Sequence, residues 1–350
     1  MKVALITDTH FGARNDSLAF DNFFRGFYEE VFWPEIDKRE IRTIFHLGDC
    51  FDRRKYINFN SLKSCREYFF DQAQKRKIKV VMIVGNHDTY FKNTNDVNSP
   101  HLLLKEYDNI YAYSIPTEYD IDGREILLMP WICTDNYEEC MESINNTTAD
   151  VCFAHLELAG YQMWAGQESH DGFDPALFKK FQLVCSGHFH HRQSKGNITY
   201  LGNPYEMFWQ DYNDVRGFHI FDTKSLDLEF IQNPFIMFSK LYYDDTKDIG
   251  YSNEDFENKY IKLIVVNKTN TYQYEKFLEK LYKANPIEVK IVEDFSEFEA
   301  DLIDDDHLDV SDTLTLLTQC VDGIETDIDK ERLKTILKTL YVEAQNIEQV

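Results

Sequence analysis

Five short runs of apolar and β-branched residues, each followed by a cluster containing Asp, Asn or His, place the strongest constraint on this chain. The runs cover residues 3–7, 43–47, 80–84, 151–154 and 183–186. Near-continuous apolar runs of this length indicate strands that are buried on both faces. Because ligands of such sheets gather outside the carboxyl ends of the strands, the five polar clusters are predicted to meet at one edge.

The segments between these runs have helical spacing, which predicts a layered α/β domain over 1–234. Residues 20–39 and 60–77 are the clearest helices, with Lys and Arg near their carboxyl ends, where these residues suit the helix dipole. A second, small βα domain is predicted over 235–295. Its strands are expected at 240–244, 260–266 and 287–292, and one apolar helix face is expected from Tyr274, Phe277, Leu278, Leu281 and Tyr282.

The C-terminal residues are predicted to be an acidic linker over 296–309 and a pair of helices over 310–350. Asp304, Asp305 and Asp306 are too charged to bury, which is typical of a linker. Helical patterns follow at 310–321 and 327–347. Two helices after a linker cannot bury both of their faces alone, so 310–350 is predicted to dock on a partner. The alternative is that this pair packs back on its own domain.

Composition excludes several classes of protein. Of the 350 residues, 43% are hydrophobic and 15% aromatic, which favours a packed core over disorder. No apolar run approaches about 18 residues and no secretory leader pattern follows Met1, so neither membrane spanning nor secretion is expected. The seven scattered cysteines include no Cys-x-x-Cys pair, which argues against a disulfide framework or a zinc ribbon and fits a cytoplasmic protein.

A net charge of −24 argues by itself against a nucleic-acid partner, since phosphate binding normally involves clustered Lys and Arg. The charge is uneven, however. Residues 1–100 contain 16 basic and 14 acidic side chains, whereas the last fifty contain 4 and 13. An anionic substrate is therefore expected to bind in the N-terminal part. The basic residues 53–55 adjoin Asp49 and are the favoured phosphate-binding patch, with a solvated helix end as the alternative.

The polar clusters at the strand ends carry the chemistry. They are Asp8-Thr9-His10, Gly48-Asp49, Gly85-Asn86-His87-Asp88, His155 and Gly187-His188-Phe189-His190. Each cluster alone is uninformative, and a lone His is usually structural. Together they offer oxygen and imidazole ligands for two divalent metal ions, with no cysteine ligand as in a structural zinc site. The glycines before Asp49, Asn86 and His188 allow a sharp turn where a Cβ atom would hinder the ligands.

This order of clusters resembles the complete motif set of the calcineurin-like metallophosphoesterases. The resemblance implies an αββα sandwich and two metal sites that share Asp49. Asp8, His10, Asp49 and His190 would bind one metal, and Asp49, Asn86, His155 and His188 the other. His87 would stabilise or protonate the leaving oxygen, and Asp52 would orient His87. Arg53 is either a phosphate contact or a solvated residue, His46 is expected to be packed, and His191 is expected to lie outside the metal shell.

Further motifs resemble the SbcD-type DNA nucleases, and the compact form resembles the recombination endonuclease subunits of T-even-type phages. These motifs are Gly48-Asp49-x-Phe51-Asp52, Tyr200-Leu201-Gly202-Asn203-Pro204, Pro130-Trp131 and His155-Leu156-Glu157-Leu158. The resemblance implies a nuclease dependent on Mn²⁺ or Mg²⁺, with exonuclease action on duplex ends and endonuclease action on single strands. Such a nuclease serves DNA recombination, repair and replication.

The same resemblance implies partners. An SbcC-like ABC ATPase with a coiled coil would be docked by 310–347, the βα domain would be a capping domain that helps to seat DNA, and two copies would pair through 60–77. A phage-encoded protein would act in the host cytoplasm. Two alternatives stay open: a metal-dependent phosphatase or phosphodiesterase on a substrate other than nucleic acid, and an inactive scaffold for the ATPase.

Overall fold

The computed structural model describes residues 1–247, 256–293, 330 and 334, and all but the last two belong to one compact unit, Met1–Phe298. The predicted linker over 296–309 and the predicted helical pair over 310–350 lie outside the described residues, except that Lys330 and Lys334 are helical. None of the helices among the described residues is both long enough and apolar enough to cross a membrane. The six cysteines in this part of the chain are buried and unpaired.

Within the described residues, the first of two six-stranded sheets has the order β14-β13-β1-β2-β3-β4. Strands β1 to β4 are parallel, and β13 and β14 continue the sheet in antiparallel fashion beside β1. The strands are β1 Lys2–Ile6, β2 Thr43–His46, β3 Lys79–Ile83, β4 Ile110–Tyr113, β13 Gly217–Asp222 and β14 Leu228–Gln232.

The second six-stranded sheet of the described part has the order β11-β12-β10-β7-β6-β5. Its four central strands are parallel, and the edge strands β5 and β11 are antiparallel to their neighbours. The strands are β5 Thr117–Ile121, β6 Arg124–Met129, β7 Val151–His155, β10 Leu183–Gly187, β11 Gln193–Lys195 and β12 Ile198–Tyr200.

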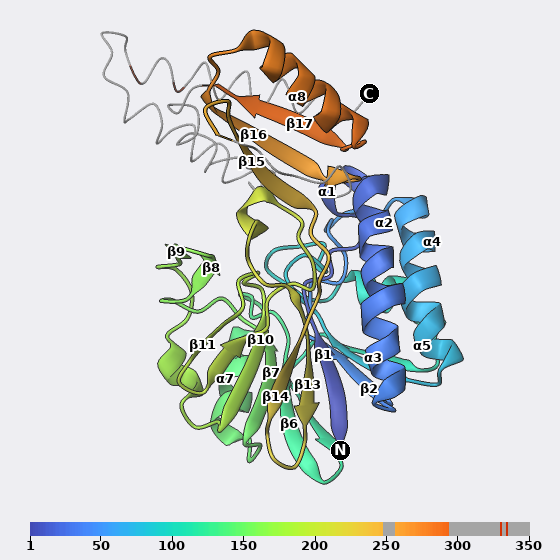
Figure 1. The fold of residues 1–350 in the computed structure, drawn as a ribbon. Coiled ribbons are helices and arrows are strands. Elements are labelled where there is room, and N and C mark those ends of the chain that lie inside the picture. Colours follow the sequence, from blue (N-terminus) through green and yellow to red (C-terminus); the bar gives the residue numbers. More distant parts are fainter. Residues whose placement is uncertain (248–255, 294–329, 331–333, 335–350) are drawn as a thin grey trace. The chain divides into compact units, whose positions relative to one another are not determined.

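The two sheets pack face to face, and helices cover their outer faces (Figure 1). Inner-face side chains of both sheets, among them Val3, Phe45 and Phe153, form one fully buried cluster. Long helices pack on the outer face of the first sheet, and α7 (Tyr137–Asn146) packs on that of the second, which confirms the predicted αββα sandwich. The five predicted strands are present as β1, β2, β3, β7 and β10, but they are divided between the two sheets. Their polar ends therefore meet where two sheets face each other.

Both predicted long helices are confirmed, and each contains a π-helical turn that the sequence did not indicate. The first consists of α2 (Leu18–Phe27), the π turn Tyr28–Phe32 and α3 (Trp33–Lys38). The second consists of α4 (Phe59–Cys65), the π turn Arg66–Phe70 and α5 (Asp71–Lys75). The two π turns pack together, because the rings of Tyr28 and Tyr68 stack with centroids 5.2 Å apart.

Short elements complete the description of the sandwich. They are α1 Ala13–Asp16, α6 Ser99–Leu103, β8 Gln162–Trp164, β9 Gln167–Glu168 and the 3-10 turns Pro175–Phe178 and Trp209–Asp211.

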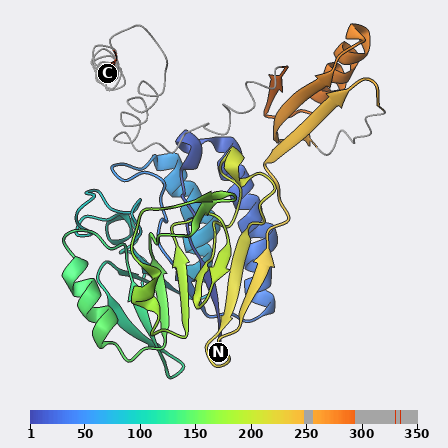
Figure 2. The same cartoon turned by 90° about the vertical axis from the view of Figure 1, so that its left-hand side faces the viewer.

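The predicted small βα domain is present as a parallel sheet with the order β15-β16-β17 and one helix, α8 (Thr271–Lys283) (Figure 2). Its strands are β15 Phe238–Asp244, β16 Tyr260–Asn267 and β17 Glu288–Val292. Tyr274, Phe277 and Leu281 pack on one face of this sheet. Tyr282 was predicted to share their face but is 55% exposed and lies outside the buried cluster that they form. The predicted boundary at 234/235 falls between β14 and β15, and the domain limits stay a prediction.

The buried carboxyl group of Glu206 lies at the junction between the sandwich and the small domain. Its Oε2 atom accepts hydrogen bonds from the backbone N–H groups of Met237 and Phe238, at 2.6 and 2.9 Å. Burial raises the pKa of Glu206 to about 7, against an ordinary value of 4.5, and the two N–H groups offset only part of this shift. The folded protein therefore holds a proton on Glu206 more tightly than the unfolded chain does.

This raised pKa predicts a pH-dependent loss of stability that Glu206→Gln should remove. As the pH rises from about 4.5 to about 7, the charged carboxylate becomes favoured in the unfolded chain first, so the free energy of unfolding falls. We expect the wild-type protein to lose about 2 kcal/mol relative to Glu206→Gln between pH 5 and pH 8. Urea denaturation across this range measures the difference.

Glu229→Gln is the matched control for that experiment. Arg39 holds the pKa of Glu229 below its usual value, so this carboxyl group stays ionised in both states above pH 5. An unchanged pH dependence in Glu206→Gln would contradict the prediction.

Candidate metal centre

The seven side chains predicted as metal ligands lie at the carboxyl ends of strands from both sheets. Asp8 and His10 follow β1, Asp49 follows β2, and Asn86 follows β3. From the second sheet, His155 ends β7, and His188 and His190 follow β10. The turns after β1 and β2 are joined directly, because the N–H groups of Asp8 and His10 donate to the carbonyls of Gly48 and Asp49 at 3.0 and 3.1 Å. The predicted convergence of the polar clusters is therefore present.

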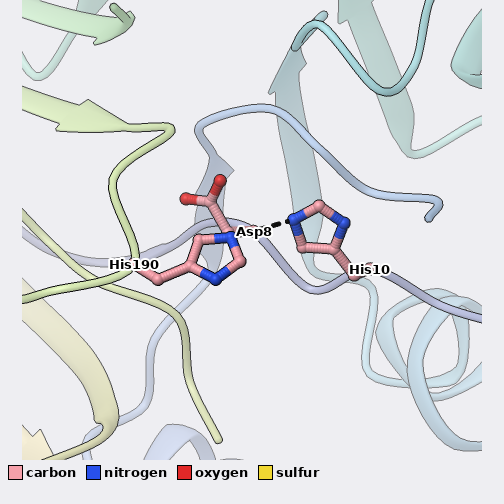
Figure 3. A group of neighbouring side chains, drawn as sticks. All are labelled: Asp8, His10 and His190. Carbon is pink, nitrogen blue, oxygen red and sulfur yellow. Dashed lines mark hydrogen bonds between the residues drawn. The ribbon is translucent and has the colours of Figure 1, made fainter. Parts of the chain in front are cut away.

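Asp8, His10 and His190 form a first cluster (Figure 3). The Nε2 atoms of His10 and His190 are 3.2 Å apart, and Asp8 and His10 are almost completely buried. Asp8 also accepts hydrogen bonds from the backbone N–H of His188 at 3.1 Å and from the hydroxyl of Thr7 at 2.7 Å. The cluster thus joins a turn of the first sheet to a turn of the second.

Asn86, His155 and His188 form a second cluster. The Oδ1 atom of Asn86 lies 3.0 Å from Nε2 of His155 and 3.0 Å from Nδ1 of His188. Nδ1 of His155 lies 2.7 Å from the carbonyl oxygen of Leu47, so a proton on Nδ1 is held there and Nε2 faces the cluster. Trp131 covers one side, with its ring centroid 5.0 Å from that of His188.

Asp49 lies between the two clusters. Its Oδ2 atom is 3.8 Å from Nε2 of His10 and 3.4 Å from Nε2 of His155, while Oδ1 accepts the backbone N–H of His87 at 2.8 Å. Burial opposes ionisation of Asp49, but the imidazoles of His155 and His87 hold its pKa well below the usual value. A buried carboxylate in this position can bridge two cations.

The electrostatics of the site favour positive charge at its centre. Burial opposes the charged forms of His10 and His155, yet the pKa of each is raised to about 9, mainly by Asp52 and Asp49 at His10 and by Asp49 at His155. Burial and the nearby His155 lower the pKa of His188 to about 3. The carboxylates thus stabilise a cation among facing oxygen and nitrogen atoms, and this donor set suits borderline-to-hard divalent ions. The residues present therefore fit the metal ions that the sequence predicted.

The backbone of the site is strained. Asp8, His10, Asp49 and His188 have φ angles of 51°, 41°, 53° and 88°, in the left-handed region that residues with a Cβ atom rarely adopt. Strain of this kind persists only where the surrounding structure over-determines it, and it concentrates at functional sites.

Three glycines make room for these side chains, as predicted, but only one of them also forms a left-handed turn. Gly48 has a φ of 93°, and a Cβ atom there would lie 2.5 Å from Nδ1 of His155. A Cβ atom on Gly85 would overlap the carboxylate of Asp49, and one on Gly187 would overlap the hydroxyl of Thr7. Close approach, rather than backbone freedom, explains these last two glycines.

His87 and Asp52 lie beside the first cluster. Nδ1 of His87 is 2.7 Å from the backbone carbonyl of Asp52, and the Asp52 carboxylate lies 3.4 Å from Nδ1 of His10. Ligand atoms of His10, Asp52 and His87 lie within 4.8 Å of one another. The predicted orientation of His87 by Asp52 stays a prediction.

Arg53 and Arg54 of the basic patch at 53–55 are held in local contacts, and phosphate binding by this patch stays a prediction. Arg53 pairs with Asp16 at 3.1 Å and hydrogen-bonds Asn15 at 2.6 Å, and Arg54 donates to the carbonyl of Thr89 at 3.2 Å. These contacts give both guanidinium groups structural roles.

The histidines that were predicted to lie outside the metal shell have other partners. His46 is buried, with Nε2 2.9 Å from the hydroxyl of Thr9, and His191 pairs with Asp214 at 2.8 Å.

Asp88 is a site residue with a structural role that its motif alone does not indicate. It is buried, and its carboxylate accepts the N–H groups of Cys50, Phe51 and Gly85 at 3.0, 3.3 and 2.9 Å. Burial and the nearby Asp49 raise its pKa to about 7. Asp88 therefore links the turn after β2 to the turn after β3. In the sequence, its position at the end of Gly85-Asn86-His87-Asp88 is the one feature that could have indicated a role in the site.

Comparisons with known proteins agree with this geometry. The family model for calcineurin-like phosphoesterases matches residues 1–192. Exonuclease subunit 1 of Enterobacteria phage T4 is 34% identical over 350 residues, which cover 98% of this chain and 99% of that protein.

Solved structures were also matched. An archaeal phosphodiesterase is 14% identical and covers 67% of this chain and 100% of its own, with a TM-score of 0.34. A protein of unknown function from Aquifex aeolicus is 18% identical and covers 56% of this chain and 82% of its own, with a TM-score of 0.27.

We predict that Gly48→Ala weakens metal binding, because the added Cβ atom would push the His155 ring away from Asp49 and Asn86. We expect metal-dependent phosphodiester cleavage to fall more than about 100-fold and Mn²⁺ binding, measured by calorimetry, to weaken by at least about 10-fold.

Gly123→Ala is the control that separates a steric clash of the added Cβ atom from the cost of a left-handed backbone conformation. Gly123 also has a positive φ, 76°, but has no atom within 4 Å of an added Cβ atom. We expect this control to cost about 1 kcal/mol of stability and to leave metal binding intact. Equal metal affinities in the two variants would contradict the assignment.

Proposed function

Since the chain belongs to the calcineurin-like phosphoesterase family and is a metal-dependent phosphodiesterase, we propose that it is a two-metal DNA nuclease. It would act as an exonuclease on duplex ends and as an endonuclease on single strands, in DNA end processing for recombination, repair and replication. The observation that supports DNA as the substrate is the similarity, over 98% of this chain, to a phage exonuclease subunit.

Two divalent cations, Mn²⁺ or alternatively Mg²⁺, would be held by the seven side chains at the joined sheet edges. Asp8, His10 and His190 would hold one, Asn86, His155 and His188 the other, and Asp49 would bridge them. When bound, such a pair activates water and neutralises charge on a phosphate. The protein's own contribution is a rigid, largely buried donor set whose turns are fixed by hydrogen bonds before any substrate arrives.

His87 is the proposed proton donor to the leaving oxygen. Its Nδ1 atom faces the carbonyl of Asp52 at 2.7 Å, which holds a proton on Nδ1 and directs Nε2 away from that contact. Its ring lies at the edge of the His10 ring, with centroids 4.9 Å apart, so it stands beside the metal centre. Asp52 positions His87 through its main chain and His10 through its carboxylate.

The small βα domain is proposed to help seat DNA. Lys240, Lys262 and Lys290 are paired in register across β15, β16 and β17, and therefore project from the same face of the sheet. Lys240 and Lys290 are partly exposed and are the proposed phosphate contacts. Lys262 between them is buried, with its ammonium group 4.6 Å from the centroid of the Trp209 ring.

We also propose two protein partners. An SbcC-like ABC ATPase with a coiled coil would be docked by residues 310–347, and two copies of this chain would pair through 60–77. At the start of α4, Phe59 is 87% exposed, which supports an interface on that helix. The complex would act in the host cytoplasm if the chain is phage-encoded.

A nuclease assay with a monoester control tests the substrate. With Mn²⁺, we expect the purified chain to cleave end-labelled DNA and to hydrolyse a phosphomonoester poorly.

Asp49→Asn should lose DNA cleavage by about 100-fold or more, because the bridging charge is lost. His87→Gln should lose about 100-fold at saturating metal while binding Mn²⁺ normally. Rapid monoester hydrolysis without DNA cleavage, even with the ATPase added, would show a non-nucleic-acid phosphatase.

Truncation tests the ATPase partner. Because 310–347 is the proposed dock, a chain ending at residue 300 should no longer co-purify with the ATPase but should keep its metal-dependent cleavage of a small phosphodiester. Co-purification at full yield would place the dock elsewhere.

A further inference from the structure

The segment 203–216 crosses from the second sheet to the first, because it connects β12 to β13. We propose that Tyr205 and Arg216 in this segment are positioning residues, which hold the first cluster by the main-chain carbonyls of Thr9 and His190. The inference rests on the proposed metal role of Asp8, His10 and His190, and it adds two residues that neither the motifs nor the predicted ligand set include.

Arg216 holds the second-sheet side of the cluster. Its guanidinium is buried and donates to the carbonyl oxygen of His190 and to Oδ1 of Asn203. The other end of the guanidinium pairs with Asp211 at 3.0 Å and Asp214 at 2.9 Å. Since a buried guanidinium with two carboxylate partners has little freedom, its donor group fixes where the His190 carbonyl lies.

Tyr205 holds the first-sheet side. Its hydroxyl donates to the carbonyl oxygen of Thr9 at 2.6 Å, and Thr9 is the residue between Asp8 and His10. The Tyr205 ring is itself fixed, because it is fully buried and stacks on Phe24 with centroids 3.8 Å apart. The hydroxyl therefore anchors a turn whose two flanking residues have left-handed backbone angles.

The segment and the cluster approach each other closely. Gly202, directly before this segment, has a φ of 72°, and a Cβ atom there would lie 2.8 Å from the His190 carbonyl oxygen. The backbone N–H of Asn203 donates to the same carbonyl at 3.3 Å. One continuous piece of chain thus contacts both turns that supply the first cluster, and these turns belong to different sheets.

The second cluster is held by other contacts. Nδ1 of His155 is placed by the carbonyl of Leu47, and the turn that carries Asn86 is tied to Asp88 through Gly85. Loss of the Tyr205 or Arg216 contacts is therefore expected to weaken one metal site and to spare the other.

Tyr205→Phe tests this directly, because it keeps the stacked ring and removes only the hydroxyl. Titration of the metal-free protein with Mn²⁺ by calorimetry should show two binding steps in the wild type. In Tyr205→Phe we expect one step to weaken by about 10-fold and the other to stay unchanged. Tyr161→Phe is the matched control, since its hydroxyl bonds the carbonyl of Lys195 away from the ligands, at 3.2 Å.

Arg216→Lys provides a second, independent variant. A lysine keeps a positive charge beside Asp211 and Asp214 but cannot also reach the His190 carbonyl and Asn203. Weakening of the same binding step, with thermal unfolding still cooperative, would support the proposal. Two unchanged steps in folded Tyr205→Phe and Arg216→Lys would overturn it. Absence of any Mn²⁺ binding in the wild type would instead overturn the proposed metal function on which it rests.

Discussion

The buried carboxylate of Asp49 lies between the two clusters of predicted metal ligands, and the electrostatics of the site depend on its charge. Its Oδ2 atom lies 3.8 Å from Nε2 of His10 and 3.4 Å from Nε2 of His155. A buried carboxylate is costly unless it is paired and hydrogen-bonded. The imidazoles and the N–H of His87 meet that requirement, and in doing so they build a centre that stabilises positive charge. The negative charge of Asp49, which attracts these imidazoles, also makes the site suitable for divalent cations.

Such a centre needs a rigid scaffold, because its turns are strained. Four of the seven side chains predicted as metal ligands have left-handed backbone angles, and three adjoining glycines leave no space for a Cβ atom. The apolar cores on both faces of each sheet fix the strand ends from which these turns start. Asp88 then joins two of the turns through three backbone N–H groups. Packing supplies the stability, and the hydrogen bonds supply the exact places of the side chains.

Local sequence patterns were sufficient for most of the fold. The apolar runs predicted β1, β2, β3, β7 and β10, and helical spacing predicted the long helices and α8. The same periodicity failed at Tyr282, because it indicates which side chains could share a helix face and not which of them the tertiary structure covers. It also failed to indicate the π turns at Tyr28–Phe32 and Arg66–Phe70, whose aromatic rings pack against each other between two helices.

The sequence by itself indicated which residues gather at the site, because each polar cluster directly follows an apolar run that forms a buried strand. Only the tertiary structure decided what holds them. It divided the ligand turns between two sheets and placed Tyr205 and Arg216 against the carbonyls of Thr9 and His190. Tyr205 and Thr9 are 196 positions apart in the chain, and no local pattern encodes a contact that arises when two packed sheets are joined by one crossing segment.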